Sequence, residues 1–248
     1  MIDRIAYTAM TGAKHAMGQL ANTSHNMANV HTPGFREIVT AFRAVPLEGE
    51  QADSRAFVVD SSPTAMFNPG PIESTDNPFD IAISTQGFFA VRRGDGSEVY
   101  TRNGRFFRDE NGVLKLGRDV SVVGEGGEIT IPAGAEMEIN QDGTVWVREN
   151  GEQRLNQVAQ IKLVNPNISD LVRADDGFFE LPKNQPPAQL DPSVRVKQGM
   201  YETSNVSAAS AMVQMINQTR MFELNMRVIQ TAEQNSRQAN ILMTLSNF

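Results

Sequence analysis

The stretch "SHNMANVHTPGF" (24–35) decides the fold, because a helical pattern ends within it. Pro33 excludes further helix, Gly34 permits a turn, and Phe35 can anchor the chain beyond that turn. Asn26 and Asn29 lie three residues apart, on one face of the preceding helix. We expect their amides to hydrogen-bond to another helix or to cap exposed carbonyl groups; the alternative is a frayed helix end rich in asparagine.

A heptad spacing of small and apolar residues runs upstream from this point. Its members follow each other at alternating steps of four and three: Ile2, Ala6, Ala9, Ala13, Ala16, Leu20, Thr23, Met27 and Val30. This spacing is typical of a coiled-coil helix. Alanine permits close approach but buries little area, so we expect this helix to be stable only against partners.

The same spacing recurs near the other end of the sequence, in a helix expected from about 207 to 246. Its members are Met212, Met215, Thr219, Phe222, Met226 and Ile229. A helix of 40 residues would span roughly 60 Å, which is typical of a bundle or coiled-coil element. We expect the two helices to pair with each other or with neighbouring copies. The methionines of the last helix favour an adaptable subunit interface over simple core packing.

The region between the helices has the composition of β structure. All 12 prolines lie between Pro33 and Pro192, and of 19 glycines only Gly12 and Gly18 lie outside 34–199. Strands are predicted at 79–85, 87–93, 98–104, 120–123, 128–132, 144–149, 158–164, 177–181 and 193–199. Asn-Gly and Asp-Gly pairs between them are typical of tight hairpins.

The predicted fold class is therefore α+β. Long N- and C-terminal helices are expected to form a coiled-coil-like inner layer, with a central antiparallel β-rich domain. The expected domains are 1–35 with 200–248, which are helical and axial, and 36–199, which is β-rich and lies outside them.

Charge and composition exclude several classes of function. The net charge of the 248 residues is −7, which argues against nucleic acid as a partner. Residues 1–31 sum to +1, residues 207–248 sum to +1, and the middle carries −9. There is no cysteine, no apolar run that approaches the roughly 20 residues of a membrane span, and no pattern of a secretory signal. We expect no membrane insertion, and export, if any, by a route without a cleaved signal peptide.

No motif points to catalysis, a cofactor or a metal. His15, His25 and His31 have no carboxylate or cysteine companions at ligand spacing. The glycine-rich stretches "RRGDGSE" (92–98) and "VGEGGEI" (123–129) fit turns, since they lack the features of calcium and phosphate loops. We therefore expect no enzyme and no cofactor.

The opening stretch resembles the rod motif of bacterial flagellar axial proteins, in which Asn-Leu-Ala-Asn-x-x-Thr-x-Gly-Phe ends the first helix. The sequence departs from that motif at Met27, where leucine is usual. Residues 77–91, 100–116 and 196–234 resemble other signatures of rod and hook proteins, in the same order. "FRAVP" (42–46) is most similar to proximal rod members, with a distal rod member as the near alternative.

The resemblance implies a structural subunit of the basal-body rod, within a drive shaft that spans the periplasm, transmits torque and encloses the export channel. The implied partners are other rod proteins, copies of this chain, and the type III export apparatus. The rod motif is assigned to Asn26, Asn29, Thr32, Pro33, Gly34 and Phe35. The assembly interface is assigned to Ile2, Ala6, Ala9, Ala13, Ala16, Leu20, Met27, Met212, Met215, Phe222, Met226 and Ile229. An oligomerising binding module with a ligand site in its β domain remains a second alternative.

Overall fold

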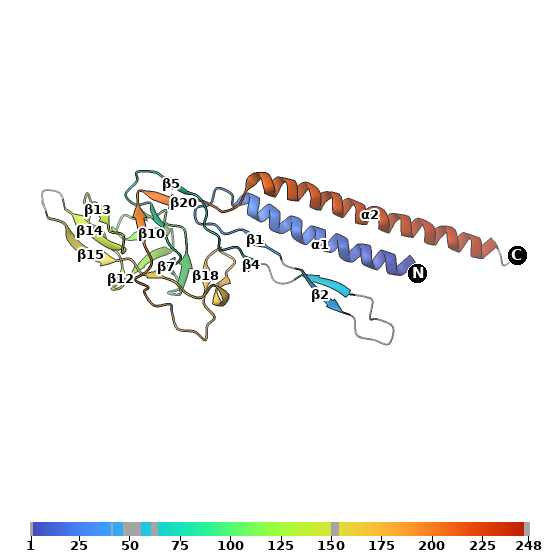
Figure 1. Cartoon of the computed structure of the whole chain (residues 1–248), viewed down its shortest axis with the longest axis horizontal. Coiled ribbons are helices and arrows are strands. Elements are labelled where there is room, and N and C mark those ends of the chain that lie inside the picture. The colour runs from blue at the N-terminus through green and yellow to red at the C-terminus, as the bar shows by residue number, and fades with distance from the viewer. Residues whose placement is uncertain (1, 41, 47–55, 61–63, 150–153, 246–248) are drawn as a thin grey trace. The chain divides into compact units, whose positions relative to one another are not determined.

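The computed structural model describes residues 2–40, 42–46, 56–60, 64–149 and 154–245 (Figure 1). The chain divides into two compact units. The helical unit comprises Met1–Val30, Ile38–Met66 and Val206–Phe248, and the β unit comprises His31–Glu37 and Phe67–Asn205. The chain thus passes several times from one unit to the other.

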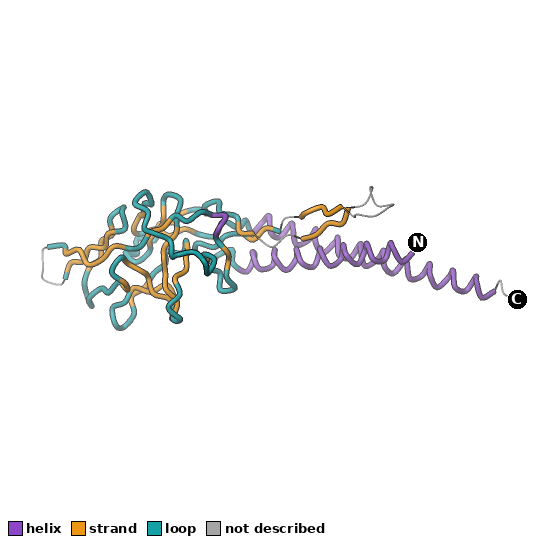
Figure 2. Tube along the Cα trace, turned by 90° about the horizontal axis from the view of Figure 1, so that it is seen from below, coloured by secondary structure: helices purple, strands orange, loops and turns teal. Residues whose placement is uncertain are grey.

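Two α-helices form the larger part of the helical unit. Helix α1 (Ile2–Ala28) has 27 residues and α2 (Ala208–Leu245) has 38, which agrees with the proline-free ends of the sequence. They run side by side in antiparallel directions, and α2 continues beyond the N-terminal end of α1 (Figures 1 and 2). The start of α2 is capped by Ser207, whose Oγ accepts from the backbone N–H of Ser210 at 3.4 Å.

The surface between the two helices is lined by small and polar residues. On α1 the buried side chains include Ala9, Ala13 and Ala16, and on α2 they include Ala211 and Ala232. Two further contacts join the helices directly. The amide of Gln218 donates to the Thr23 hydroxyl at 2.9 Å, and a Cβ added at Gly12 would lie 2.7 Å from Oδ1 of Asn225. The Asn225 side chain thus occupies the space that a side chain at Gly12 would fill.

The predicted coiled-coil-like inner layer is wrong, although the α+β class is compatible with the structure. The described residues contain two α-helices, one near each end, which pack as one antiparallel pair, while the β body is large and antiparallel. The physical reason lies in the paired faces. Their fully buried positions include alanines, and the amides of Gln218 and Asn225 also lie between the helices, so the large apolar residues do not interlock in the continuous pattern of a coiled coil.

The helical unit also contains two short antiparallel pairs. Strand β1 (Ile38–Val39) pairs with β4 (Thr64–Ala65), and β2 (Phe42–Pro46) pairs with β3 (Ala56–Asp60). The "FRAVP" stretch of the sequence is thus strand β2. The sequence analysis did not predict these strands. Strands β1 and β4 have only two residues each, and no Asn-Gly or Asp-Gly pair lies between β2 and β3.

The β unit is built on a nine-stranded antiparallel sheet. Its main order is β17-β18-β8-β7-β11-β10-β9, with β12 on β11 and β16 on β7. The strands of this sheet are β7 (Phe88–Arg93), β8 (Glu98–Thr101), β9 (Phe107–Arg108), β10 (Leu114–Gly117), β11 (Val120–Gly124), β12 (Gly127–Glu128), β16 (Leu163–Val164), β17 (Val172–Arg173) and β18 (Phe179–Glu180).

Three smaller sheets complete the β unit. Strand β14 (Thr144–Arg148) lies between β13 (Glu136–Ile139) and β15 (Asn156–Gln160). Strand β19 (Val196–Gln198) pairs with β6 (Ile81–Ile83), and β20 (Met200–Glu202) pairs with β5 (Ile72–Ser74). A short 3-10 helix covers Ile168–Asp170.

The core of the β unit is formed by apolar residues of several strands. Ile81, Phe89, Leu114, Val122 and Ile161 are completely buried in one cluster. The predicted strand at 128–132 is only partly present. Its apolar residues belong to this core, but only Glu128 lies in a strand, because Ile129 and Ile131 make isolated bonds to Leu114 and Gly112. The alternation of apolar and polar residues at 128–132 therefore reflects which side chains are buried, and not a continuous ladder of hydrogen bonds between strands.

Candidate functional site

The end of α1 holds the next segment of the helical unit through asparagine side chains. The Asn26 amide donates to the carbonyl of Ile38 at 2.8 Å, and its Oδ1 accepts from the Ile38 N–H at 2.9 Å. Asn22, one turn earlier, donates to the hydroxyl of Thr40 at 2.6 Å. Asn29, one residue after the end of α1, instead donates to the carbonyl of His25 in the last turn of that helix. Asn26 therefore binds a strand rather than a helix, and Asn22 is a contributor that the sequence interpretation missed.

The remaining rod-motif residues make a tight turn in the β unit. Phe35 N–H donates to the carbonyl of Thr32, and Gly34 N–H donates to the carbonyl of Glu202 at 2.8 Å. Gly34 has a φ of 66°, and a Cβ added there would lie 2.3 Å from the backbone nitrogen of Asn103. Both the positive φ and this close approach require glycine. Pro33 is half-buried in the same turn.

Phe35 anchors the segment as an apolar side chain. It is buried, and the guanidinium of Arg173 lies 4.5 Å from the centroid of its ring. Arg173 also donates to the carbonyl of Arg36 at 2.8 Å. Burial lowers the pKa of Arg173, but the group stays charged at neutral pH and makes a cation–π contact.

A buried triad of charged side chains follows the rod motif. Arg36 and Arg102 both bind the carboxylate of Glu202, at 2.6 Å and 2.7 Å, and the three side chains are 2%, 5% and 0% exposed. Gly70 N–H donates to the same carboxylate at 2.8 Å. Arg102 also donates to three backbone carbonyls of the segment from Ile83 to Gly87. Burial lowers the pKa of Arg102, and the Glu202 carboxylate opposes that effect.

Asn205 connects three segments by which the chain passes between its units. Its Oδ1 accepts from the Glu37 N–H at 2.7 Å, and its Nδ2 donates to the carbonyl of Asn68 at 3.0 Å. Its backbone N–H donates to the carbonyl of Phe35 at 3.3 Å. The triad and Asn205 together fix the positions at which the chain enters and leaves the β unit.

The residues predicted for the assembly interface fall into three groups. Ala9, Ala13 and Ala16 are buried, whereas Ala6, Leu20, Met27, Met215, Phe222 and Ile229 are half-buried. Met212 and Met226 are exposed. Ile2 lies in α1, and its side chain falls outside the described part. On α2 the less exposed positions between Met215, Phe222 and Ile229 are Gln218 and Asn225, one residue before Thr219 and Met226.

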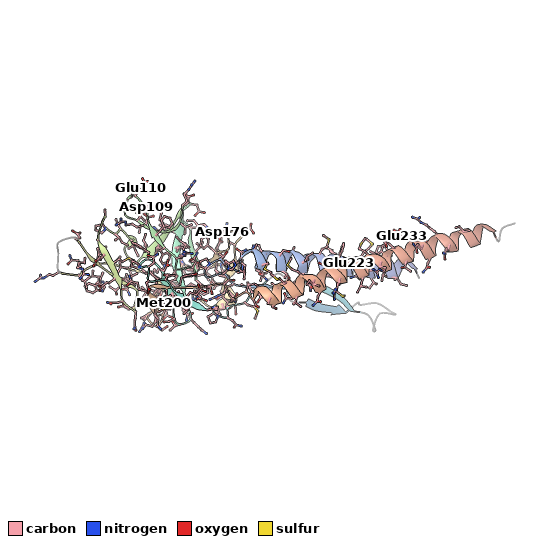
Figure 3. All side chains as sticks on the ribbon, turned by 90° about the horizontal axis from the view of Figure 1, so that it is seen from above. Asp109, Glu110, Asp176, Met200, Glu223 and Glu233 are labelled. Carbon is pink, nitrogen blue, oxygen red and sulfur yellow. The ribbon has the colours of Figure 1, made fainter. Side chains whose placement is uncertain are left out.

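Large apolar side chains cover the other faces of both helices. On α1 they are Ile5, Tyr7, Met10 and Met17; on α2 they are Met212, Val213, Ile216, Met221, Leu224, Met226, Val228 and Ile241. Glu223 and Glu233, the two acids of α2, lie along the same helix and are also exposed (Figure 3). So much exposed apolar surface on a helix is typical of a protein–protein interface.

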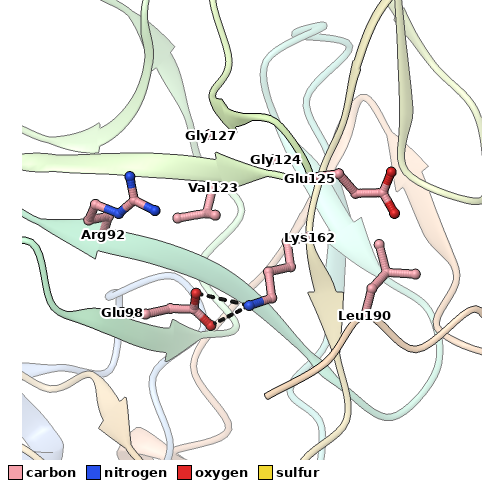
Figure 4. Close-up of a pocket in the computed structure, with 8 residues that line it drawn as sticks. All are labelled: Arg92, Glu98, Val123, Gly124, Glu125, Gly127, Lys162 and Leu190. Carbon is pink, nitrogen blue, oxygen red and sulfur yellow. Dashed lines mark hydrogen bonds and ion pairs between the residues drawn. The ribbon is translucent and has the colours of Figure 1, made fainter. Parts of the chain in front are cut away.

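The cavity in Figure 4 is lined in part by charged side chains, of which Lys162 and Glu98 form a pair. It has a volume of about 540 Å³ and lies in the β unit. Lys162 donates to both carboxylate oxygens of Glu98, at 2.8 Å and 2.9 Å. Within the described ranges there is no cluster of His, Asp and Glu suited to a metal ion. Over the same ranges, neither helix has an apolar stretch sufficient to cross a bilayer.

These features define a class of protein. The two helices expose large apolar side chains, and buried polar groups fix the segments by which the chain passes between its units. Both are properties of a structural subunit that assembles with others. The family model described as the flagellar hook protein FlgE/F/G D1 domain matches residues 82–147, and that of the flagellar basal body rod FlgEFG protein C-terminal region matches 197–242.

The chain is similar over nearly its whole length to rod proteins. The chain is 40% identical to the flagellar basal-body rod protein FlgF of Escherichia coli K12 and 38% identical to that of Salmonella typhimurium LT2, in each case over 99% of this chain and all of the relative. It is 30% identical to the rod protein FlgG of Buchnera aphidicola subsp. Schizaphis graminum, over 85% of this chain and 88% of that protein. The chain belongs to the family of flagellar basal-body rod proteins, and the FlgG alternative is less well supported.

Proposed function

We propose that this chain is a subunit of the proximal part of the flagellar rod. The observation that carries the proposal is the apolar outer surface of α1 and α2, which one copy leaves exposed. Burial of such surface between subunits is favourable, and repeated head-to-tail contacts build a helical stack. The similarity to FlgF proteins over nearly the whole chain supports the proximal position.

In this proposal the terminal regions 1–35 and 200–248 face the axis of the rod, and the β-rich region 36–199 faces outward. The summed contacts of many copies transmit torque, and the stack encloses the export channel. Other rod proteins and copies of this chain are the neighbours. The type III export apparatus delivers the subunit to a rod that spans the periplasm. The chain has no catalytic role there.

The test is a substitution on the outer face of α2. In the bacterium that carries this chain, Ile216→Asp should abolish incorporation into purified basal bodies and abolish motility, because it places a charge in the buried contact. Ile216→Leu is the matched control, since it keeps an apolar side chain at the same exposed position. Circular dichroism checks that both variants fold. Normal motility of a folded Ile216→Asp variant would contradict the assignment of this face.

A further inference from the structure

A second cavity in the β unit combines an apolar wall with buried positive charge. It has a volume of about 700 Å³ and lies between the segment that starts at Phe67 and the turn Ser84–Gly87. Phe67, Ile72, Phe88 and Ile168 supply most of its apolar lining. Phe67 and Phe88 contact each other edge-on at 6.0 Å, and both contact Phe179, so this wall is well packed. The lining is suited to an apolar side chain.

The charged residues of this cavity do not balance. Arg36, Arg102 and Glu202 are the charged members of its lining, which leaves one positive charge in excess. Arg102 has bonds to three carbonyls besides Glu202, whereas Nε of Arg36 is buried and has no hydrogen-bond partner among the described residues. A buried cation that is incompletely neutralised is costly, and an added anion relieves that cost.

We propose that this cavity binds a carboxylate side chain, together with an apolar neighbour, from an adjacent rod subunit. The carboxylate would neutralise the excess charge at Arg36, and the apolar neighbour would lie against Phe67 and Ile72. Polar side chains at the mouth, including Gln86 and Asn68, remain able to bind the partner's backbone.

This inference rests on the proposed function for the identity of the partner, but its chemistry can be tested on the free chain. The probe is N-acetyl-leucyl-glutamic acid amide, which is titrated into the full chain. Binding is followed by the NMR chemical shifts of the backbone amides of Gly70 and Gly87, which line the cavity. The matched probe contains glutamine instead of glutamate. We expect shifts at both glycines and about tenfold weaker binding of the glutamine probe, because hydrogen bonds to a charged group are stronger. Equal binding of the two probes, or shifts only elsewhere, would overturn the proposal.

A cross-linking experiment identifies the source of the carboxylate. Gln86→Lys places an amine at the exposed mouth of the cavity, and a carbodiimide joins it to a carboxylate only when the two are in contact. In purified basal bodies we expect a cross-link to an acidic residue of a rod subunit, located by mass spectrometry. The native Lys197, exposed in the same unit, reports background coupling.

The outcomes separate this inference from the proposed function. One outcome is that, in basal bodies that contain the chain, coupling at the substituted position is no greater than coupling at Lys197. That result refutes the proposed binding of a carboxylate in the cavity and leaves the rod assignment intact. Absence of the chain from basal bodies refutes the rod assignment itself.

Discussion

Replacement of Asn26 by alanine should release strand β1 from helix α1. Asn26 is 3% exposed and exchanges two hydrogen bonds with the backbone of Ile38. The substitution leaves an N–H and a carbonyl without their partners, at about 1–3 kcal/mol for each buried group. Ile38 is half-buried, so water compensates in part. We therefore expect the lower part of that range, about 2–4 kcal/mol in total.

Hydrogen exchange at the Ile38 amide measures this effect directly. A loss of about 2–4 kcal/mol corresponds to exchange that is about 30- to 700-fold faster. Asn26→Asp is an informative companion, because it keeps the acceptor for the Ile38 N–H but replaces the donor by a charge that repels the Ile38 carbonyl. Its Ile38 amide should exchange at an intermediate rate.

Asn29→Ala is the matched control for this prediction. The Asn29 side chain donates to the carbonyl of His25 in the last turn of α1, so its loss should cost at most about 1 kcal/mol and leave Ile38 protected. Unchanged exchange at Ile38 in a folded Asn26→Ala variant would refute the role assigned to the first asparagine of the motif.

Three further predictions concern the β unit. Glu202→Gln leaves two buried arginines without a carboxylate, so the free energy of unfolding should fall by about 3–5 kcal/mol in denaturant titrations. The control, Glu180→Gln, breaks the partly exposed pair with Arg93 and should lower the free energy of unfolding by under about 1 kcal/mol. A comparable loss in both variants would contradict the importance of burial. The Thr144 N–H donates a hydrogen bond to Asp142 and lowers the pKa of that carboxyl group, so the stability that the bond contributes is present above the unfolded pKa of about 3.9 and is lost as pH falls through the folded pKa. The slope of melting temperature against pH, below about pH 4, should therefore be shallower in Asp142→Asn. An identical slope in the variant would argue against this contribution. Burial raises the pKa of Tyr100 to about 12, so ultraviolet titration should show one of the three tyrosines ionising near that pH, and this late step should vanish in Tyr100→Phe.

The positions of the helices could be predicted from the sequence because the information is local. Proline and glycine are nearly absent from both ends, and the Pro33-Gly34 pair stops the first helix within a few residues of its observed end at Ala28. Most strands of the large sheet were found in the same way, from β-forming residues between turn pairs. Of the two-residue strands in that sheet, β16 and β18 lie within the predicted segments 158–164 and 177–181. Strands β9 and β17 were missed, because so short a segment has no pattern of its own.

The packing of the helices could not be predicted so well. A heptad pattern identifies the most apolar stripe of a helix. On α2 it placed Met212 and Met226 on the face that was expected to contact another helix. The structure instead has Gln218 and Asn225 against α1, because Gly12 and the alanines of α1 allow a close approach in which short polar side chains fit. The large side chains are thereby left for other contacts.

The buried triad lay beyond any sequence pattern. Arg36 and Glu202 are 166 residues apart, and Arg102 and Glu202 are 100 apart, so no spacing rule connects them. A useful signal did exist for Asn22, since it precedes Asn26 by one helical turn and so lies on the same face. Residues that share a helical face can thus be read from the sequence. The contacts that join the segments between the two units are known only from the fold.

Methionine oxidation tests the central claim, that the outer faces of the helices are buried between rod subunits. Met10, Met17, Met212 and Met221 are 54–57% exposed in the single chain, whereas Met137 in the β unit is 5% exposed. The free chain and purified basal bodies would be treated with dilute peroxide, and the rate at each methionine measured by mass spectrometry. We expect the four helix methionines to react readily in the free chain and at least about tenfold more slowly in basal bodies, as slowly as Met137. Equal rates in the two samples would show that these faces stay open to solvent in the rod and would contradict the account.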